Sequence, residues 1–192
     1  MRSALCSEHS VGHNERMDFD GPTTKTVEPF RICFVCAGNI CRSPMAEVVF
    51  TSLAARAGLG AHVSVASAGT GDWHVGEQAD GRTVAALHRR GYDGTAHRAR
   101  QFEAEWFADL DLVVALDRSH ERILRSWATT DEDRGKIGLL LAFDAGQVHL
   151  GDVPDPYYSD DRMFDEVLGM IERACIALFR QLQPAVRQGA TQ

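Results

Sequence analysis

The sequence predicts an α/β fold: a three-layer α-β-α arrangement with a central four-stranded parallel sheet and helices on both faces. The first observation behind it is an alternation of short apolar runs with longer stretches whose apolar residues recur at helical spacing, the pattern of parallel βαβ units. The second is size, because 192 residues with 44% hydrophobic residues are enough for one buried core and few for two.

Composition narrows the binding partners and the compartment. A formal net charge of −7 disfavours nucleic acid and anionic membrane surfaces, so an anionic ligand would need a local positive site. No apolar run is long enough for a membrane span, and residues 1–16 lack the apolar region of a secretory signal. The cysteines are odd in number, with Cys33, Cys36 and Cys41 close together. This favours reduced thiols and a cytoplasmic location over a disulfide framework.

One domain, residues 30–185, is predicted between two flexible ends. Residues 1–29 lack hydrophobic periodicity and contain the turn-forming pair Gly21-Pro22, so a flexible leader is predicted there. Met17 is an alternative start, and the sequence does not decide between it and Met1. Residues 186–192 are predicted to form a flexible C-terminal tail.

The first elements of the domain follow from local signals. Residues 30–35 form an apolar run typical of a buried strand. A helix is predicted over residues 44–58, with Ser43 as N-cap, a proline at the first helical position and Gly58 as the stop. Residues 63–66 are predicted to form the second strand, followed by a glycine-rich loop.

The remaining elements continue the alternation. Residues 110–116 are apolar apart from Asp111 and give the clearest strand pattern. In parallel sheets ligands bind beyond the carboxyl ends of the strands, so the segment after the first strand lies in the predicted binding region. A further strand is predicted over residues 137–143, and helices over residues 79–90, 101–108, 118–127 and 161–183.

The segment Cys36-Ala37-Gly38-Asn39-Ile40-Cys41-Arg42-Ser43 is typical of a phosphate-binding loop. Consecutive backbone N–H groups entering a helix form an anion site, and the helix N-terminus adds positive potential. Gly38 permits close backbone approach, Asn39 tolerates a left-handed conformation, and Arg42 has a planar fork that can bind two phosphate oxygens. The same positive field favours the thiolate of Cys36, which predicts a nucleophile directed at a bound phosphorus.

Other interpretations of this segment have weaker support. Cys33 and Cys36 form a CxxC pair, but a zinc site needs further ligands at suitable spacing, and a redox pair normally opens a helix. Cys33 lies inside the apolar run and is interpreted as a small core residue. Neither GxGxxG nor GxxxxGK[ST] is present, which disfavours a nucleotide-binding loop.

A second segment, Asp155-Pro156-Tyr157-Tyr158, supplies a candidate acid. Expelling an aryl oxide from a phosphate requires a proton on the leaving oxygen, and Asp155 on a loop stiffened by Pro156 could deliver it. Two of the three tyrosines of the chain lie here, where they could wall a cleft against an aromatic leaving group. Alone, Asp-Pro indicates only a turn; beside a Cys-to-Arg phosphate loop, the acid role is favoured.

Together these segments resemble the low-molecular-weight protein tyrosine phosphatases over residues 32–182. Residues 35–44 resemble the phosphate loop of that family, and residues 155–158 resemble its acid segment. Residues 67–70, the pair Asp72-Trp73 and residues 97–101 resemble segments that flank and support the cleft. One departure is Ser159, where the family often has glycine.

The resemblance implies a role for each matching residue. Cys36 would be the nucleophile, Arg42 the phosphate clamp, Asp155 the general acid and then base, and Ser43 would stabilise the departing thiolate. Asn39, Ser67 and His97 would hold the loop in shape. The loop residues Ala37, Gly38, Asn39, Ile40, Cys41 and Ser43 would bind the phosphate, with Trp73, Tyr157 and Tyr158 lining the substrate cleft. No metal and no cofactor are implied.

Alternative interpretations stay open for His97 and Cys41, and for Asp117, which lies outside the matching segments. His97 is explained equally well as a surface or capping histidine, and Asp117 as a helix cap or as support for the site. Cys41, five residues after the nucleophile, is predicted to form a reversible disulfide with Cys36 that protects it from overoxidation. Its alternative is a small buried filler. Trp106 and Trp127 are interpreted as packing residues.

The implied function is hydrolysis of phosphotyrosine, and of small aryl phosphates, through a phosphocysteine intermediate. Two alternatives remain: a thioredoxin-coupled arsenate reductase of the same fold, and a phosphate-binding module without turnover. The expected partners are phosphotyrosine-containing proteins and a cognate tyrosine kinase, with no nucleic acid and no membrane. The protein is expected to be a cytoplasmic monomer or weak dimer.

Overall fold

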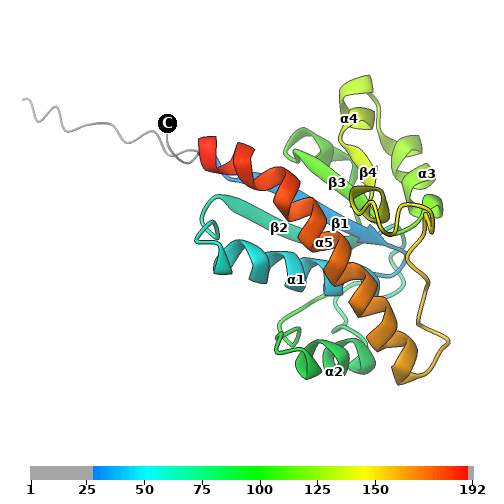
Figure 1. The fold of residues 1–192 in the computed structure, drawn as a ribbon. Helices are drawn as coiled ribbons and strands as arrows, with labels where there is room; N and C mark the ends of the chain where they lie inside the picture. Colours follow the sequence, from blue (N-terminus) through cyan, green and yellow to red (C-terminus); the bar gives the residue numbers. More distant parts are fainter. Residues whose placement is uncertain (1–27, 190–192) are drawn as a thin grey trace, which may run out of the picture.

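The computed structural model describes residues 28–189, and its centre is a fully parallel sheet (Figure 1). The strands run in the order β2-β1-β3-β4, with helices on both faces, as the sequence predicts. The strands are β1 (Phe30–Cys36), β2 (Val63–Gly69), β3 (Leu112–Ala115) and β4 (Ile137–Leu139).

Different helices cover the two faces of the sheet. α1 packs on β1, β2 and α5, while α3 packs on β3 and β4. In Figure 1, α5 crosses the sheet on the same side as α1, with α3 on the other side. The α-helices are α1 (Arg42–Arg56), α2 (Gly81–Arg89), α3 (Arg118–Trp127), α4 (Asp131–Gly135) and α5 (Asp161–Gly189), and the 3-10 helices are η1 (Ala104–Ala108) and η2 (Leu140–Phe143).

The central strand β1 is buried on both sides, which explains its apolar sequence. Ile32 and Phe34 face the core beneath α1 and α5, whereas Cys33 and Val35 face the core beneath α3. Cys36 lies on the same side as Ile32 and Phe34, so Cys33 and Cys36 point to opposite faces. Cys33 is fully buried, which confirms it as a core residue and excludes a paired CxxC site.

Two predicted elements are wrong in their conformation. Only Ile137–Leu139 of the predicted strand 137–143 pairs with β3; Leu140–Phe143 forms η2. The reason is packing, because Leu140 and Leu141 are both buried in the same core cluster, whereas consecutive strand residues would point to opposite faces. The predicted helix 101–108 is helical only from Ala104, and Gln101 forms an isolated bridge to Gly69 instead.

The chain ends differ from the prediction in extent. α5 continues through Pro184 to Gly189, so residues 186–189 of the predicted tail are helical. Burial of Val186 against the core explains the continuation. Residues 190–192, and residues 1–27 of the predicted leader, lie outside the described part of the chain. Between residues 28 and 189, no helix is long and apolar enough to cross a membrane.

The sheet register places the candidate loop at a strand crossover. Cys36 pairs with Gly69 of β2, and Val35 pairs with Ala115 of β3, so the carboxyl ends of the three strands meet at one edge. The chain leaves β1 for β2 on one side and then returns to β3 on the other. Such a reversal of strand order opens a crevice at the carboxyl edge, where ligands bind in this class of fold.

Candidate active site

Residues 36–42, here called the phosphate loop, join the end of β1 to the first residue of α1 and are held from outside by their carbonyl groups. The Cys36 and Ala37 carbonyl oxygens accept hydrogen bonds from Thr70 N (2.8 Å) and Gly71 N (2.9 Å). Further along, the carbonyl oxygen of Ile40 accepts from the backbone N–H of Asp80 at 2.9 Å. Because these acceptors are bonded outward, we infer that the backbone N–H groups of the loop face the concave side, as an anion requires.

Helix α1 begins without a side-chain cap, which is a second feature of an anion site. Cys41 occupies the N-cap position and makes no side-chain capping bond. The predicted N-cap, Ser43, is wrong, since the helix already begins at Arg42 and Ser43 lies inside its first turn. The uncapped N–H groups and the helix dipole together favour a bound anion.

Asn39 fixes the shape of the phosphate loop from within. It is fully buried and has a φ of 57°, a left-handed conformation that asparagine tolerates better than most residues. Its Nδ2 donates to Ser43 Oγ and to Ser67 Oγ, both at 2.8 Å, and its Oδ1 accepts from the Arg100 backbone N–H at 2.9 Å. Every polar group of this side chain therefore has a partner in the scaffold.

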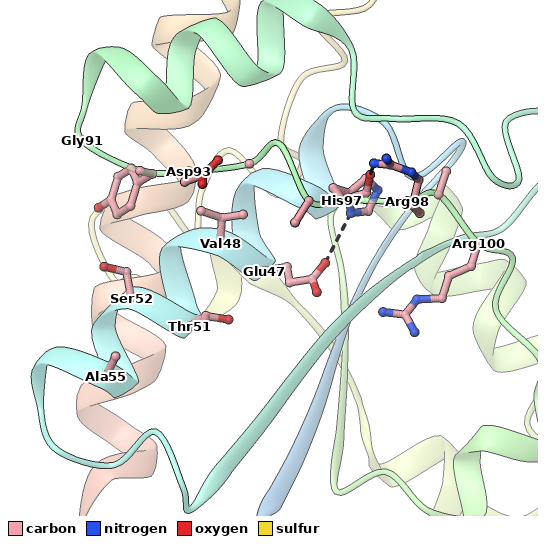
Figure 2. Close-up of a pocket in the computed structure, with 14 residues that line it drawn as sticks. Glu47, Val48, Thr51, Ser52, Ala55, Gly91, Asp93, His97, Arg98 and Arg100 are labelled. Carbon is pink, nitrogen blue, oxygen red and sulfur yellow. Dashed lines mark hydrogen bonds and ion pairs between the residues drawn. The ribbon is translucent and has the colours of Figure 1, made fainter.

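His97 and Glu47 extend this scaffold behind the loop (Figure 2). His97 Nε2 lies 2.7 Å from the carbonyl oxygen of Asn39, and its Nδ1 lies 3.6 Å from Glu47 Oε2. Ser67 Oγ donates to the same Glu47 oxygen at 2.5 Å. The structure thus places His97 in the scaffold. Glu47 was missed, and Arg100 was included only within the supporting segment 97–101, without a role of its own. Glu47 lies one helical turn after Ser43, which is the only signal that marks it.

A cavity of about 750 Å³ lies on this outer side of the scaffold, between α1 and residues 91–100 (Figure 2). It contains Glu47 and His97 but no cysteine. A smaller cavity of about 360 Å³ opens over the phosphate loop and contains Cys36, Arg42 and Asp155. The smaller cavity, here called the catalytic pocket, is therefore the candidate active site.

Cys36 lies at the base of the catalytic pocket and is only 3% exposed. Its Sγ lies 3.0 Å from Ser43 Oγ. Burial raises the pKa of the thiols of Cys33 and Cys41 to about 12, so both are neutral thiols near pH 7. For Cys33 and Cys41, burial thus opposes a role as the nucleophile that attacks phosphorus.

Arg42 is buried beside two carboxylates. Its Nη1 lies 2.9 Å from Asp117 Oδ2 and donates to the carbonyl oxygen of Val153 at 3.2 Å. Its Nη2 lies 2.6 Å from Asp155 Oδ2. The Nε is buried and has no hydrogen-bond partner within residues 28–189. This leaves a donor of the planar guanidinium for a ligand, since buried polar groups are normally bonded.

Asp117 serves both roles that the sequence left open. Its Oδ1 accepts from the backbone N–H groups of Ser119 and His120 at the start of α3, and its Oδ2 binds Arg42. Burial alone would raise the pKa of this carboxyl, but the bonds from Ser119 and His120 and the nearby charges of His120 and Arg42 hold it below its usual value. Asp117 therefore remains a carboxylate that fixes Arg42.

The acid segment forms the opposite wall of the catalytic pocket. Asp155 is half exposed, and its Oδ1 accepts from the backbone N–H of Tyr157 at 3.1 Å. Tyr157 is half-buried and meets Tyr158 edge-on, with ring centroids 4.9 Å apart. Tyr158 and Trp73 are 96% and 70% exposed, so both stand at the rim with apolar surface free for a substrate.

His74 also lines the catalytic pocket and was missed in the sequence. Its Nδ1 lies 2.7 Å from Glu77 Oε2, and its ring packs against Gly38, where any β-carbon would come within 2.8 Å of it. The only sequence signal was its position directly after Trp73. Gly38 thus lets the His74 ring lie directly against the phosphate loop.

The structure brings the predicted residues together in two layers. One layer lines the catalytic pocket, and the other supports the phosphate loop from below. An arrangement of thiol, guanidinium, backbone donors and carboxyl group can bind a phosphate ester, attack it and protonate its leaving group. The lining layer contains Cys36, Ala37, Gly38, Ile40, Cys41, Arg42, Trp73, Asp155, Tyr157 and Tyr158, and the supporting layer contains Asn39, Ser43, Ser67 and His97.

Comparison with known proteins agrees with this geometry. Residues 31–188 match the family model described as low molecular weight phosphotyrosine protein phosphatase. A low molecular weight protein-tyrosine-phosphatase of Streptomyces coelicolor is 52% identical over 159 residues, which cover 82% of this chain and 96% of the relative. Low molecular weight protein-tyrosine phosphatase A of Mycobacterium tuberculosis is 47% identical over 148 residues, covering 77% and 88%.

A solved structure extends the similarity to three dimensions. The crystal structure of YfkJ from Bacillus subtilis matches with a TM-score of 0.77 at 37% identity. The match covers 82% of this chain and 97% of that chain. The similarity therefore extends over most of both chains rather than over a local motif alone.

Proposed function

The chain belongs to the low molecular weight phosphotyrosine protein phosphatase family, and we propose that it hydrolyses phosphotyrosine through a phosphocysteine intermediate formed on Cys36. The observation that carries the proposal is the meeting of Cys36, Arg42 and Asp155 in one pocket, from segments more than 100 residues apart in sequence. Small aryl phosphates are expected to be substrates as well.

The first step transfers the phosphoryl group to the enzyme. The Cys36 thiolate attacks phosphorus, and the bond from phosphorus to the phenolic oxygen breaks. Asp155 donates its proton to that oxygen, so the product leaves as a neutral phenol. Arg42 and the backbone N–H groups of the phosphate loop bind the equatorial oxygens, where negative charge is concentrated.

The second step regenerates the thiolate. Asp155, now a carboxylate, takes a proton from water as the water oxygen attacks the phosphocysteine. The sulfur–phosphorus bond breaks, inorganic phosphate is released and the electron pair returns to Cys36. Ser43, with its hydroxyl 3.0 Å from the sulfur, stabilises the departing thiolate. Asn39, Ser67 and His97 keep the loop in the shape that both steps need.

Arsenate reduction is less well supported. It needs further thiols that relay electrons to a redox partner. Within residues 28–189 and apart from Cys41, Cys33 faces the opposite core, and Cys175 is fully buried on the core side of α5. A phosphate-binding module without turnover would not need an acid, whereas Asp155 lies in the pocket beside Arg42. Both features favour the phosphatase.

Partners and location follow from this chemistry. Phosphoproteins are the substrate class of the family, and a cognate tyrosine kinase would supply the phosphotyrosine. The chemistry requires a reduced Cys36, and the four described cysteines are unpaired, which supports a reducing compartment such as the cytoplasm. For the oligomeric state we propose a monomer or a weak dimer.

The test is rapid-mixing kinetics with p-nitrophenyl phosphate. Wild type is expected to show a burst of nitrophenol equal to the enzyme concentration, followed by slower turnover, whereas Cys36→Ser should show neither. Asp155→Ala should slow hydrolysis of phenyl phosphate, whose basic leaving group needs the acid, by about 10²- to 10⁴-fold. A protein that consumes arsenate with thioredoxin but leaves aryl phosphates intact would be a reductase, and one that binds phosphotyrosine without a burst would be a binding module.

A further inference from the structure

Arg82, in the first turn of α2, lies between the phosphate loop and the loop that carries Asp155. The turn itself is fixed to the phosphate loop, because the Asp80 N–H bonds to the carbonyl oxygen of Ile40 at 2.9 Å. The Asp80 side chain caps α2 by accepting from the backbone N–H of Arg82 at 2.8 Å. The contact with the phosphate loop therefore sets the backbone position of Arg82.

The guanidinium of Arg82 reaches from there to residues 154–159, the loop that carries Asp155 and is here called the acid loop. Nε and Nη2 bind the two carboxylate oxygens of Asp80 at 3.0 and 2.8 Å. On its other edge, Nη1 donates to the carbonyl oxygen of Ser159 at 2.9 Å, and Nη2 donates to that of Tyr157 at 3.0 Å. One planar group thus joins a carboxylate on one loop to two carbonyl groups on the other, which the single ammonium of a lysine could not copy.

Packing holds the guanidinium in this orientation. Its central carbon lies 4.5 Å from the ring centroid of Phe164, a fully buried residue of α5. The Tyr157 ring lies within 5.9 Å of the same carbon. A cation over an aromatic face is attracted by the ring. Because the Phe164 ring is fully buried, its position beneath the guanidinium is fixed.

The acid loop has few other anchors. For the backbone of residues 154–159, the two bonds from Arg82 are the hydrogen bonds that the described part of the chain provides from outside the loop. The Tyr157 N–H donates in turn to Asp155 Oδ1 at 3.1 Å. The orientation of the Tyr157 backbone therefore links Arg82 to the carboxyl group of Asp155.

We propose that Arg82 is the positioning residue for the general acid. It ties the acid loop to the phosphate loop, so that the Asp155 carboxyl group stays at the distance from Cys36 that leaving-group protonation requires. This role rests on the proposed phosphatase function and adds to it a residue outside the catalytic pocket. Small displacements of a catalytic group reduce rates strongly, so the effect of losing Arg82 should be large although it touches no substrate.

The proposal predicts a specific kinetic signature rather than a general loss. Phenyl phosphate has a basic leaving group close to that of tyrosine and depends on the acid, whereas the weakly basic nitrophenolate needs little protonation. Arg82→Met should therefore lower kcat/KM for phenyl phosphate at least about tenfold more than for p-nitrophenyl phosphate. Arg82→Lys, which retains the charge but not the fork, should show a smaller change in the same direction.

A double-mutant comparison separates positioning from simple loss of structure. In the Asp155→Ala background the acid is absent, so Arg82→Met should change the ratio of the two kcat/KM values by no more than about twofold. Arg89→Met is the matched control on the same helix, because Arg89 pairs with Asp165 of α5 instead of the acid loop, and it should leave the ratio unchanged. Thermal unfolding identifies any variant that does not fold. If Arg82→Met does not fold, the comparison of the two kcat/KM values is made with Arg82→Lys instead.

Each outcome is decisive. Equal losses on both substrates, or an undiminished change of ratio in the Asp155→Ala background, would overturn the positioning role while leaving the phosphatase intact. Wild-type protein that hydrolyses neither phosphate would instead overturn the proposed function itself.

Discussion

The hydroxyl oxygen of Ser43 lies 3.0 Å from the sulfur of Cys36, and both groups are buried at the base of the catalytic pocket. The Asn39 amide donates to the same oxygen at 2.8 Å, which occupies one of its lone pairs and leaves its own proton for the sulfur or for the Ala68 carbonyl oxygen at 3.3 Å. Ser43 is therefore oriented to donate to a thiolate when one is present.

The substitution Ser43→Ala should slow the step in which the thiolate departs. A hydrogen bond to a charged group is worth about 1.5–3 kcal/mol, so kcat should fall by about 10- to 100-fold. The burst of nitrophenol should persist, because phosphoryl transfer to Cys36 precedes the affected step. Rapid-mixing kinetics measure both quantities, and loss of the burst together with an unchanged kcat would contradict the assigned role.

Local sequence was sufficient to predict the strand and loop that carry the nucleophile. The apolar run of β1 and the spacing from Cys36 to Arg42 depend on neighbours in sequence, and so does the turn at Asp155. The N-cap at Ser43 was wrong for a physical reason. An anion-binding loop leaves its helix N-terminus uncapped, so the serine that resembles a cap is free to contact the sulfur.

Supporting contacts could not be predicted because they join distant segments through side-chain packing. Arg82 reaches Ser159 across 77 positions, and Arg100 reaches the carbonyl oxygen of Ser67 across 33. Glu47 is likewise defined only by the meeting of α1 with the end of β2. Nothing in the spacing of these charged residues distinguishes them from the charged residues on the solvent-exposed faces of ordinary helices.

Cys41 gives a prediction for oxidative stress. Burial raises the pKa of its thiol to about 12, so Cys36 should be oxidised first, to a sulfenic acid. That group would condense with the Cys41 thiol, which forms the disulfide and releases water. After mild peroxide, dithiothreitol should restore wild-type activity but not that of Cys41→Ser. Equal permanent loss in both proteins would exclude the protective disulfide.

His120 gives a prediction for the pH dependence of stability. Burial, with a smaller contribution from the Arg42 charge, lowers the pKa of His120 to about 4 from 6.5, although Asp117, Asp155 and Asp152 act in the opposite direction. The folded protein thus keeps this imidazole neutral, whereas the unfolded chain binds a proton below pH 6.5. Its contribution to stability is complete above that pH and is lost as the pH falls toward 4.

The substitution His120→Asn removes this titration. Between pH 7 and pH 5 the wild-type free energy of unfolding should fall by about 2 kcal/mol more than that of the variant. Urea unfolding at the two pH values measures the difference. Parallel losses in the two proteins would show that His120 is protonated equally in both states.

Gly69 gives the most direct test of the phosphate-loop geometry. A β-carbon at this position would lie 2.6 Å from the Ala37 carbonyl oxygen, 3.0 Å from that of Gly71 and 3.2 Å from the Asn39 nitrogen. All three are backbone atoms, and two of them belong to the phosphate loop. Gly69 cannot move away easily, because its N–H and its carbonyl oxygen are bonded to residues 100 and 102 at 2.8 Å.

The substitution Gly69→Ala should therefore displace the loop rather than the strand. Overpacking costs about 1–3 kcal/mol of stability, which the domain can tolerate, but misplacement of Cys36 and the backbone donors should lower kcat/KM by about 100-fold. Gly135→Ala is the matched control, because a β-carbon there meets open space. A Gly69→Ala protein that folds and retains kcat/KM within about threefold of wild type would mean that the loop reaches a productive shape without this close contact, and that catalysis tolerates more displacement than the packing of Gly69 against Ala37 implies.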